Sequence, residues 1–197
     1  MKMKLKLIGL LEQHKQGIHL REISRLLNTG LPNVKRYISL LENEKVIKKQ
    51  KEANLLKIKL NKSHKTIAYL KQVNTERFIA LPNIVQTAIT DFLDELDTKP
   101  ILTIIFGSYA TGNYNKQSDI DLLLVFQKVE NPKQIENSAK RISMRTNTNI
   151  NPVYLNYKNF ETNFLNKQHN FSKEIKEKAI ILSGTEHYYP LLWRFLA

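Results

Sequence analysis

Residues 101–126 read ILTIIF, GSYATG, NYNKQ and then SDIDLLLVF, and this stretch decides the fold. Two apolar runs rich in β-branched residues, joined by small and polar residues, predict two buried strands with a short helix or loop between them. Side chains on a strand alternate between its faces, so Asp119 and Asp121 share one face, opposite to Ile120. Two neighbouring carboxylates are costly unless cations hold them together. The stretch therefore predicts a metal site at the start of the second strand.

The same stretch offers groups that suit a nucleoside triphosphate. Gly107 lets the backbone approach phosphates closely, and Ser108 can donate its hydroxyl and its amide to phosphate oxygens. A pair of Mg²⁺ or Mn²⁺ ions about 3.5–4 Å apart, bridged by Asp119 and Asp121, would activate an attacking hydroxyl and stabilise leaving pyrophosphate. Phosphoryl-type transfer needs little from a protein beyond the positioning of the reactants and the stabilisation of charge.

The motif resembles that of the nucleotidyltransferase superfamily that includes DNA polymerase β. The signature is Gly-Ser, ten residues and Asp-x-Asp, which Gly107-Ser108 and Asp119-x-Asp121 match; Gly112 and Ser118 add to the agreement. The resemblance implies a small mixed-sheet domain that transfers a nucleoside monophosphate to a hydroxyl of a protein, nucleic acid or small molecule. Asp119 and Asp121 would be catalytic and hold the metal, and Gly107, Ser108 and Ser118 would bind the nucleotide. The alternative is an ordinary turn followed by a cap at Ser118-Asp119.

The third acid expected from the resemblance is missing. Active members usually bring an Asp or Glu from a later strand, and the corresponding strand over residues 149–155 has none, so Asn151 is assigned to the third metal position. A neutral amide removes one negative charge from the site, which predicts a weaker nucleophile-side metal. Three interpretations follow: catalysis with Asn151 and water as ligands, an acid borrowed from Glu161 or from a partner, or nucleotide binding without catalysis.

The N-terminal third predicts three short helices and a hairpin. Apolar residues recur at helical spacing through residues 4–13, 20–27 and 31–41, and two strands follow at residues 46–51 and 54–60. This order resembles a winged helix-turn-helix, in which the third helix lies in the DNA major groove and the hairpin contacts phosphates. The resemblance places Asn33, Lys35, Arg36 and Ser39 on the reading helix, and Lys48, Lys49, Lys51 and Lys57 on the wing.

Charge is concentrated in this N-terminal third. The formal net charge is +13, and residues 1–60 carry 14 Lys and Arg against 5 Asp and Glu, whereas residues 61–100 balance and the remainder carries +4. Such an excess favours a polyanionic partner, and DNA is the expected one. The alternative is a solvated basic face on a module for protein docking or dimerisation.

The whole chain is predicted to be α/β (α+β) with three parts: a winged helix-turn-helix over residues 1–60, a helical connector over 61–99, and the nucleotidyltransferase domain over 100–197. The chain has no cysteine, which excludes disulfides and thiolate zinc sites, and no apolar run near the roughly 20 residues that span a bilayer. We expect a cytoplasmic protein without a membrane partner.

Helices are predicted over residues 131–144, 157–165 and 171–181, followed by an aromatic tail over 186–195. The tail suggests either core packing or a surface that docks a partner or a purine base. Lys140, Arg141 and Arg145 either line a substrate cleft or form a solvated surface.

Two functions are consistent with these features. The first is a metal-dependent nucleotidyltransferase with a DNA-binding domain, of the antitoxin type that the resemblance suggests, which would modify a partner toxin. The second is a DNA-binding regulator whose C-terminal domain senses nucleotide without turnover. The intact Asp119-x-Asp121 favours the enzyme, whereas the basic hairpin favours the regulator and Asn151 weakens the case for the enzyme.

Overall fold

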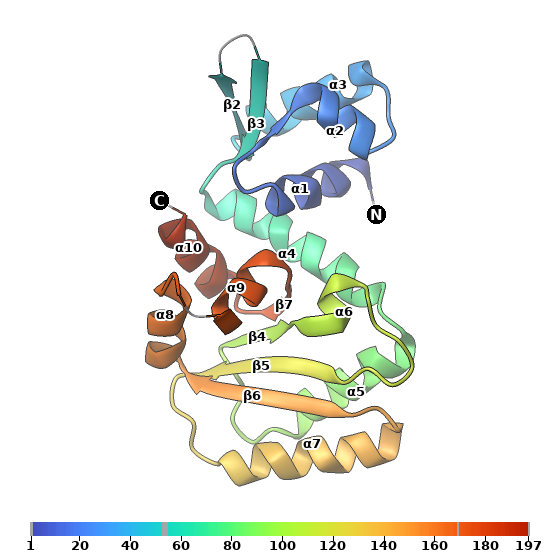
Figure 1. Cartoon of the computed structure of the whole chain (residues 1–197), viewed down its shortest axis with the longest axis vertical. Helices are drawn as coiled ribbons and strands as arrows, with labels where there is room; N and C mark the ends of the chain where they lie inside the picture. Colours follow the sequence, from blue (N-terminus) through green and yellow to red (C-terminus); the bar gives the residue numbers. More distant parts are fainter. Residues whose placement is uncertain (1, 53–54, 169, 197) are drawn as a thin grey trace. The chain divides into compact units, whose positions relative to one another are not determined.

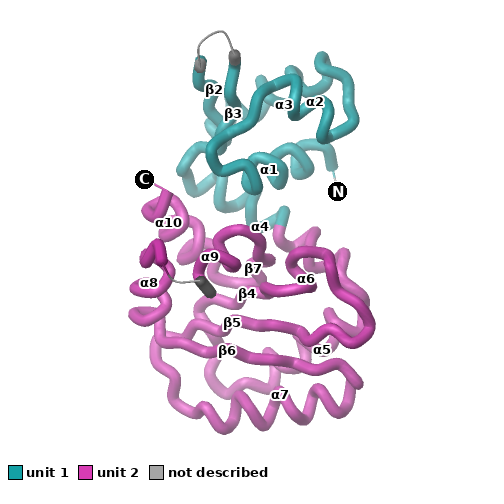
Figure 2. The backbone as a smooth tube through the Cα atoms, in the orientation of Figure 1, with its two compact units in different colours: residues 1–73 teal, residues 74–197 magenta. Residues whose placement is uncertain are grey.

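The computed structural model describes residues 2–52, 55–168 and 170–196. The chain divides into two compact units, residues 1–73 and residues 74–197 (Figure 2). The boundary falls inside helix α4 (His64–Ile79). Each unit has its own apolar core.

Unit 1 contains the predicted three helices and hairpin in the predicted order. Its elements are α1 (Met3–Gln13), β1 (Ile18–His19), α2 (Leu20–Leu26), α3 (Leu31–Asn43), β2 (Ile47–Glu52) and β3 (Leu55–Leu60). Strand β1 was not predicted; it is two residues long and pairs with β3, so the sheet has the order β1-β3-β2 (Figure 1). Helix α3 buries Val34, Ile38 and Leu41, which lie on one helical face.

Unit 2 is a mixed sheet flanked by helices, as predicted. Its elements after α4 are α5 (Asn83–Glu95), β4 (Leu102–Ile105), α6 (Gly107–Thr111), β5 (Ile120–Phe126), α7 (Pro132–Thr146), β6 (Ile150–Asn156), α8 (Tyr157–Leu165), α9 (Asn170–Glu177), β7 (Ile180–Ser183) and α10 (Thr185–Phe195). The strand order is β6-β5-β4-β7, with β5 and β6 parallel and the other pairs antiparallel (Figure 1).

Helix α7 makes the crossover between the parallel strands β5 and β6, because parallel neighbours cannot be joined by a hairpin. It begins after Asn131, whose side chain accepts the Gln134 N–H, and it ends at Asn147 in the left-handed region. Its buried residues Ile135, Ala139 and Ile142 pack in one cluster with α5 and with β5. Helix α5, predicted as part of a connector, therefore supplies core residues of unit 2.

The predicted helix over residues 171–181 is wrong in its last part. Residues 180–183 form strand β7, in which Ile180 and Ile181 pair with β4. A short apolar run fits a helix or a buried strand equally well, and pairing with a distant strand decides between them. The buried amide of Asn74 helps to hold this edge strand, since its Oδ1 accepts the Ile181 N–H at 2.8 Å and its Nδ2 donates to the Tyr189 hydroxyl at 2.8 Å.

The aromatic tail belongs largely to the core. Tyr188 and Tyr189 in α10 are 3% and 1% exposed, and their rings meet edge to face with centroids 5.1 Å apart. Phe164 of α8 packs on Tyr188 in the same way. Of the two interpretations of the tail, core packing and a docking surface, these contacts match core packing. None of the described helices has the length and apolar character needed to cross a membrane.

Candidate functional site

The two predicted carboxylates lie at the beginning of strand β5, one just before it and one within it. Asp119 is exposed in the loop that leads directly into the strand, and Asp121 is half-buried at the second strand position. Every other residue of β5 is buried. The one residue of this apolar strand that is not fully buried is therefore an acid, and packing of the core does not account for an acid at this position.

Gly107 lies directly against the Asp121 carboxylate. It begins α6 with φ +67°, in the left-handed region. A Cβ built on Gly107 would overlap Oδ2 of Asp121 and lie 3.2 Å from its Cγ. Glycine is therefore required here both for the backbone conformation and for the room that the carboxylate occupies.

Asn151 contacts the other oxygen of the same carboxylate. Asp121 and Asn151 are register partners in the parallel β5–β6 pair, so both side chains point to the same face. Asn151 Nδ2 donates a hydrogen bond to Asp121 Oδ1 at 2.9 Å. The structure thus places Asp121 between Gly107 on the β4 side and Asn151 on the β6 side.

The predicted nucleotide-binding serines flank the same region. Ser108 lies in the first turn of α6, and its carbonyl accepts hydrogen bonds from Thr111 Oγ1 and from the Asn113 N–H. Ser118 Oγ accepts the Asn115 N–H at 2.9 Å and so closes the loop before β5. The Ser118 hydroxyl can still donate its own hydrogen, since only the oxygen is engaged in that bond.

Two tyrosines support the loop between α6 and β5, and the sequence analysis did not single them out. The rings of Tyr109 and Tyr114 stack with centroids 4.6 Å apart, and the Tyr109 hydroxyl is 3.5 Å from the Ser118 carbonyl oxygen. Burial, followed by the charges of Tyr114 and Asp119, raises the pKa of Tyr109. The Tyr109 hydroxyl is therefore neutral. Its buried ring supports the loop that carries Asp119 by stacking on Tyr114.

The donor set suits one hard divalent cation. Asp119 and Asp121 offer carboxylate oxygens, which Mg²⁺ prefers. No group of three His, Cys, Asp or Glu side chains with metal-binding potential occurs in the described part of the chain. Glu161, the acid considered as a substitute, is instead paired with Arg194 at 2.6 Å.

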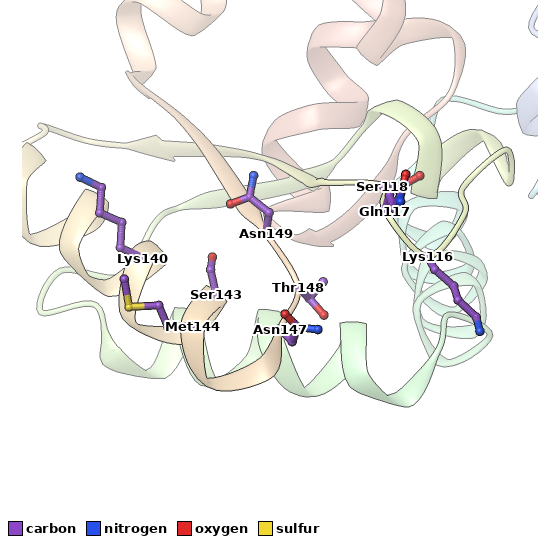
Figure 3. Close-up of a pocket in the computed structure, with 9 residues that line it drawn as sticks. All are labelled: Lys116, Gln117, Ser118, Lys140, Ser143, Met144, Asn147, Thr148 and Asn149. Carbon is purple, nitrogen blue, oxygen red and sulfur yellow. The ribbon is translucent and has the colours of Figure 1, made fainter.

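An open groove adjoins this region between α7 and the edge strand β6. It comprises a cavity of about 470 Å³ and a neighbouring one of about 570 Å³, which share Lys140 and Asn149. The first reaches Ser118 and the second reaches Asn151 (Figure 3 shows the first). Of the three basic residues considered earlier, only Lys140 lines the groove, because Arg141 pairs with Glu95 and Arg145 with Asp91 on α5.

In unit 1, the predicted DNA-binding residues lie on α3 and on the hairpin strands, with Lys48, Lys49 and Lys51 on β2 and Lys57 on β3. Lys35, Arg36 and Ser39 are exposed, whereas Asn33 is half-buried and its Nδ2 donates to Thr29 Oγ1 at 3.1 Å. Arg36 Nη2 donates to Asn33 Oδ1 at 3.2 Å.

Lys48 and Lys49 are exposed on β2 and point to opposite faces, because successive strand side chains alternate. Lys49 also forms an ion pair with Glu42 of α3. The two lysines therefore differ in the face of the strand on which they lie and in the ion pair that Lys49 forms.

Comparison with known proteins identifies the class of the C-terminal unit. Residues 87–184 match the family described as Polymerase beta, Nucleotidyltransferase. A protein of Methanocaldococcus jannaschii described as "Putative protein adenylyltransferase MJ0141" is 30% identical over 94 residues, which are 46% of this chain and 87% of that protein. No solved structure matches the chain. The chain belongs to the polymerase beta nucleotidyltransferase family. The family match covers residues 87–184 and does not extend to residues 1–86.

Proposed function

We propose that unit 2 transfers a nucleoside monophosphate, preferentially AMP, from a nucleoside triphosphate to a hydroxyl group. The observation that carries the proposal is the placement of the Asp121 carboxylate, which rests against Gly107 with one oxygen and is held by Asn151 at 2.9 Å through the other. Asp119 precedes Asp121 by two residues and lies in the loop directly before β5. The preference for AMP follows from the description of the M. jannaschii relative.

Each residue has a distinct task in this proposal. Asp119 and Asp121 hold a divalent cation, and Gly107 and Ser108 hold the phosphates with backbone and hydroxyl donors. A bound Mg²⁺ or Mn²⁺ supplies charge neutralisation to the triphosphate and lowers the pKa of an attacking hydroxyl. Asn151 orients Asp121 by its hydrogen bond and cannot itself accept a proton, because an amide is not a base at neutral pH.

A transfer assay with α-labelled ATP tests the proposal. The full chain is incubated with Mg²⁺ and with protein, nucleic-acid and small-molecule hydroxyl acceptors. Label is expected in one class of product, and chelation of the metal is expected to prevent it. If no labelled product forms with any class of acceptor, the proposed activity is contradicted.

The Asn151→Asp variant is expected to bind metal more tightly and to depend on it for stability. Without divalent ions, a carboxylate that faces Asp121 replaces a hydrogen-bond donor, which should lower the free energy of unfolding by about 1 kcal/mol. Excess Mg²⁺ should reverse the loss, since binding at about 100 times Kd stabilises by about 2.7 kcal/mol. Denaturant unfolding with and without Mg²⁺ measures both effects.

Asn159→Asp is the matched control for this variant, because it adds the same charge at an exposed position of α8. Its unfolding should respond to Mg²⁺ as the natural sequence does. An Asn151→Asp variant with the same response as Asn159→Asp would show that residue 151 lies outside the metal site.

A second candidate function concerns unit 1, which we propose to be a winged helix-turn-helix that binds DNA. The support is the exposed basic surface on α3 and on the hairpin of β2 and β3, together with the excess of 14 basic over 5 acidic residues in residues 1–60. With this domain the protein would be either an antitoxin-type transferase that acts on a partner toxin and binds DNA, or a DNA-binding regulator that senses nucleotide. The labelled-transfer assay separates the two.

Lys48→Ala is expected to weaken DNA binding and to reduce the slope of log K against log salt by about one, the value for one lost phosphate contact. Lys49→Ala should change the slope less, because Lys49 is already paired with Glu42. Fluorescence anisotropy of a labelled duplex at several salt concentrations measures both. Equal slopes for Lys48→Ala and the natural sequence would show that Lys48 on β2 does not contact DNA phosphates.

A further inference from the structure

The sheet β1-β3-β2 of unit 1 has one side on the core and one open side. Ile18, Ile47 and Ile58, one from each strand, are at most 2% exposed. Lys49 points to the same side as these isoleucines, because it is the register partner of Ile58, and it pairs with Glu42 of α3. Helix α3 therefore lies on the isoleucine side of the sheet. The residues that alternate with the isoleucines point to the opposite side.

That opposite side, which we call the open sheet face, is basic. Its described side chains are three lysines, one amide and one imidazole: Lys48, Lys57, Lys59, Gln50 and His19. In the register, Lys48 lies directly opposite Lys59, and Lys57 lies between Gln50 and His19. Lys48 and Gln50 are exposed, and the other three residues are half-buried. Three positive charges therefore share one side of a small sheet.

The lysines predicted on the wing consequently do not form a single surface. Lys49 and Lys51 point to the side of α3, whereas Lys48 and Lys57 belong to the open sheet face. Lys59, which the sequence analysis did not assign to DNA binding, adds a third lysine to the open sheet face. Strand alternation thus divides the basic residues of the hairpin between two sides of unit 1.

The open sheet face holds its lysines at an electrostatic cost. Like charges directly opposite each other destabilise a sheet, and this is the arrangement of Lys48 and Lys59. The stem of Lys59 lies across Gly17, since a Cβ built on Gly17 would be 2.5 Å from Lys59 Cγ and 2.9 Å from Lys59 Cε. Packing of the stem therefore keeps this charge on the face. A bound polyanion would offset the repulsion between the lysines.

Helix α3 presents its own basic residues on a different side of unit 1. Val34 and Ile38 are 2% exposed and face the core, whereas Lys35 and Arg36 on the other side of the helix are exposed. Because α3 lies on the isoleucine side of the sheet, the core separates these two basic residues from the open sheet face. A straight duplex bound to α3 would therefore leave the open sheet face uncovered.

We propose that the open sheet face binds the phosphate backbone of a second DNA duplex while α3 binds a first, so that one copy of unit 1 brings two duplexes together. The inference rests on the proposed DNA binding of unit 1. Lysine contacts to phosphates carry no base preference, so binding to the open sheet face is expected to be independent of sequence and to weaken steeply with salt. The described side chains of this face include no apolar group that could insert into a lipid surface, which favours nucleic acid over a membrane.

Energy transfer between labelled duplexes tests the bridging. Copies of one short duplex, labelled with either a donor or an acceptor dye, are mixed with the full chain, and sedimentation gives the number of duplexes per chain. The natural sequence is expected to bind two duplexes per chain and to produce energy transfer. Lys57→Glu combined with Lys59→Glu is expected to keep the duplex on α3 and to lower the affinity for the second duplex about tenfold or more.

Two further variants complete the design. Lys2→Glu combined with Lys6→Glu reverses the same number of charges at exposed positions near the beginning of the chain, and it should keep both duplexes. Lys35→Glu combined with Arg36→Glu should lose the duplex on α3 and keep the one on the open sheet face, so it should bind DNA without energy transfer. Circular dichroism shows that each variant is folded.

Three results would overturn the inference. The first is one duplex per chain of the natural sequence, and the second is equal energy transfer in the Lys57→Glu, Lys59→Glu variant and in the Lys2→Glu, Lys6→Glu variant. The third is binding of anionic phospholipid vesicles to the open sheet face in preference to the second duplex. Each of these results leaves DNA binding by α3 intact, whereas no bound duplex at all would contradict the proposed DNA binding and the inference with it.

Discussion

Gly107→Ala is expected to lower the rate of nucleotidyl transfer about 10²-fold and to destabilise unit 2. The new Cβ would overlap Oδ2 of Asp121, so the carboxylate has to move away from its place against α6. A displacement of about 1 Å in a reacting group can cost about 10²-fold in rate. The left-handed backbone at φ +67° adds about 1–2 kcal/mol of strain with any L side chain. Denaturant unfolding and labelled transfer measure the two effects.

Gly112→Ala provides a matched control within the same motif. Gly112 also has a left-handed φ, +81°, but a Cβ there would meet nothing within 4 Å. Its variant should therefore carry the backbone strain of about 1–2 kcal/mol and keep most of the activity. If both alanine variants lost activity equally, the contact between Gly107 and Asp121 would not be the cause.

Asp119→Asn and Asp121→Asn are each expected to lower kcat/KM by about 10³-fold, which corresponds to about 4 kcal/mol of lost transition-state stabilisation. The change keeps the shape of the side chain and removes the charge that would hold the cation. The loss should persist at saturating Mg²⁺ if the carboxylates also align the phosphates. Kinetic measurements across a range of Mg²⁺ concentrations determine this.

Asp94→Asn is the control for these variants, since Asp94 is an exposed acid on α5. It should retain the kcat/KM of the natural sequence. Activity retained in Asp121→Asn would contradict the assignment of Asp121, whatever the behaviour of Asp119→Asn.

Much of unit 2 follows from local sequence because the deciding signals are local. The apolar run that ends at Phe106 and the alternation through Asp119 and Asp121 place β4 and β5. The residues between them were compatible with a short helix or a loop, and the structure has the helix α6. The crossover between β5 and β6 requires a long connection, which the periodic residues of α7 supply. Asn151 was placed beside Asp121 by aligning strands, and the structure has the two residues in register.

Other features could not be predicted because they depend on contacts between distant residues. Strand β7 exists through pairing with β4, some 77 residues earlier at the Ile104–Ile181 partners, and its own residues also fit a helix. Lys140 lines the groove whereas Arg141 and Arg145 do not, because the two arginines form ion pairs with acids of α5. The direction of the Asn151 amide depends on the carboxylate that it faces.

Calorimetric binding of a non-hydrolysable ATP analogue with Mg²⁺ tests the proposed site most directly. The natural sequence is compared with the combined Asp119→Ala and Asp121→Ala variant, whose folding is checked by denaturant unfolding. Binding by the natural sequence and its loss in the folded variant is the predicted result. Equal binding by both proteins, or no binding by the natural sequence at about millimolar nucleotide, the weak end of ordinary affinities, would contradict a nucleotide site at these aspartates.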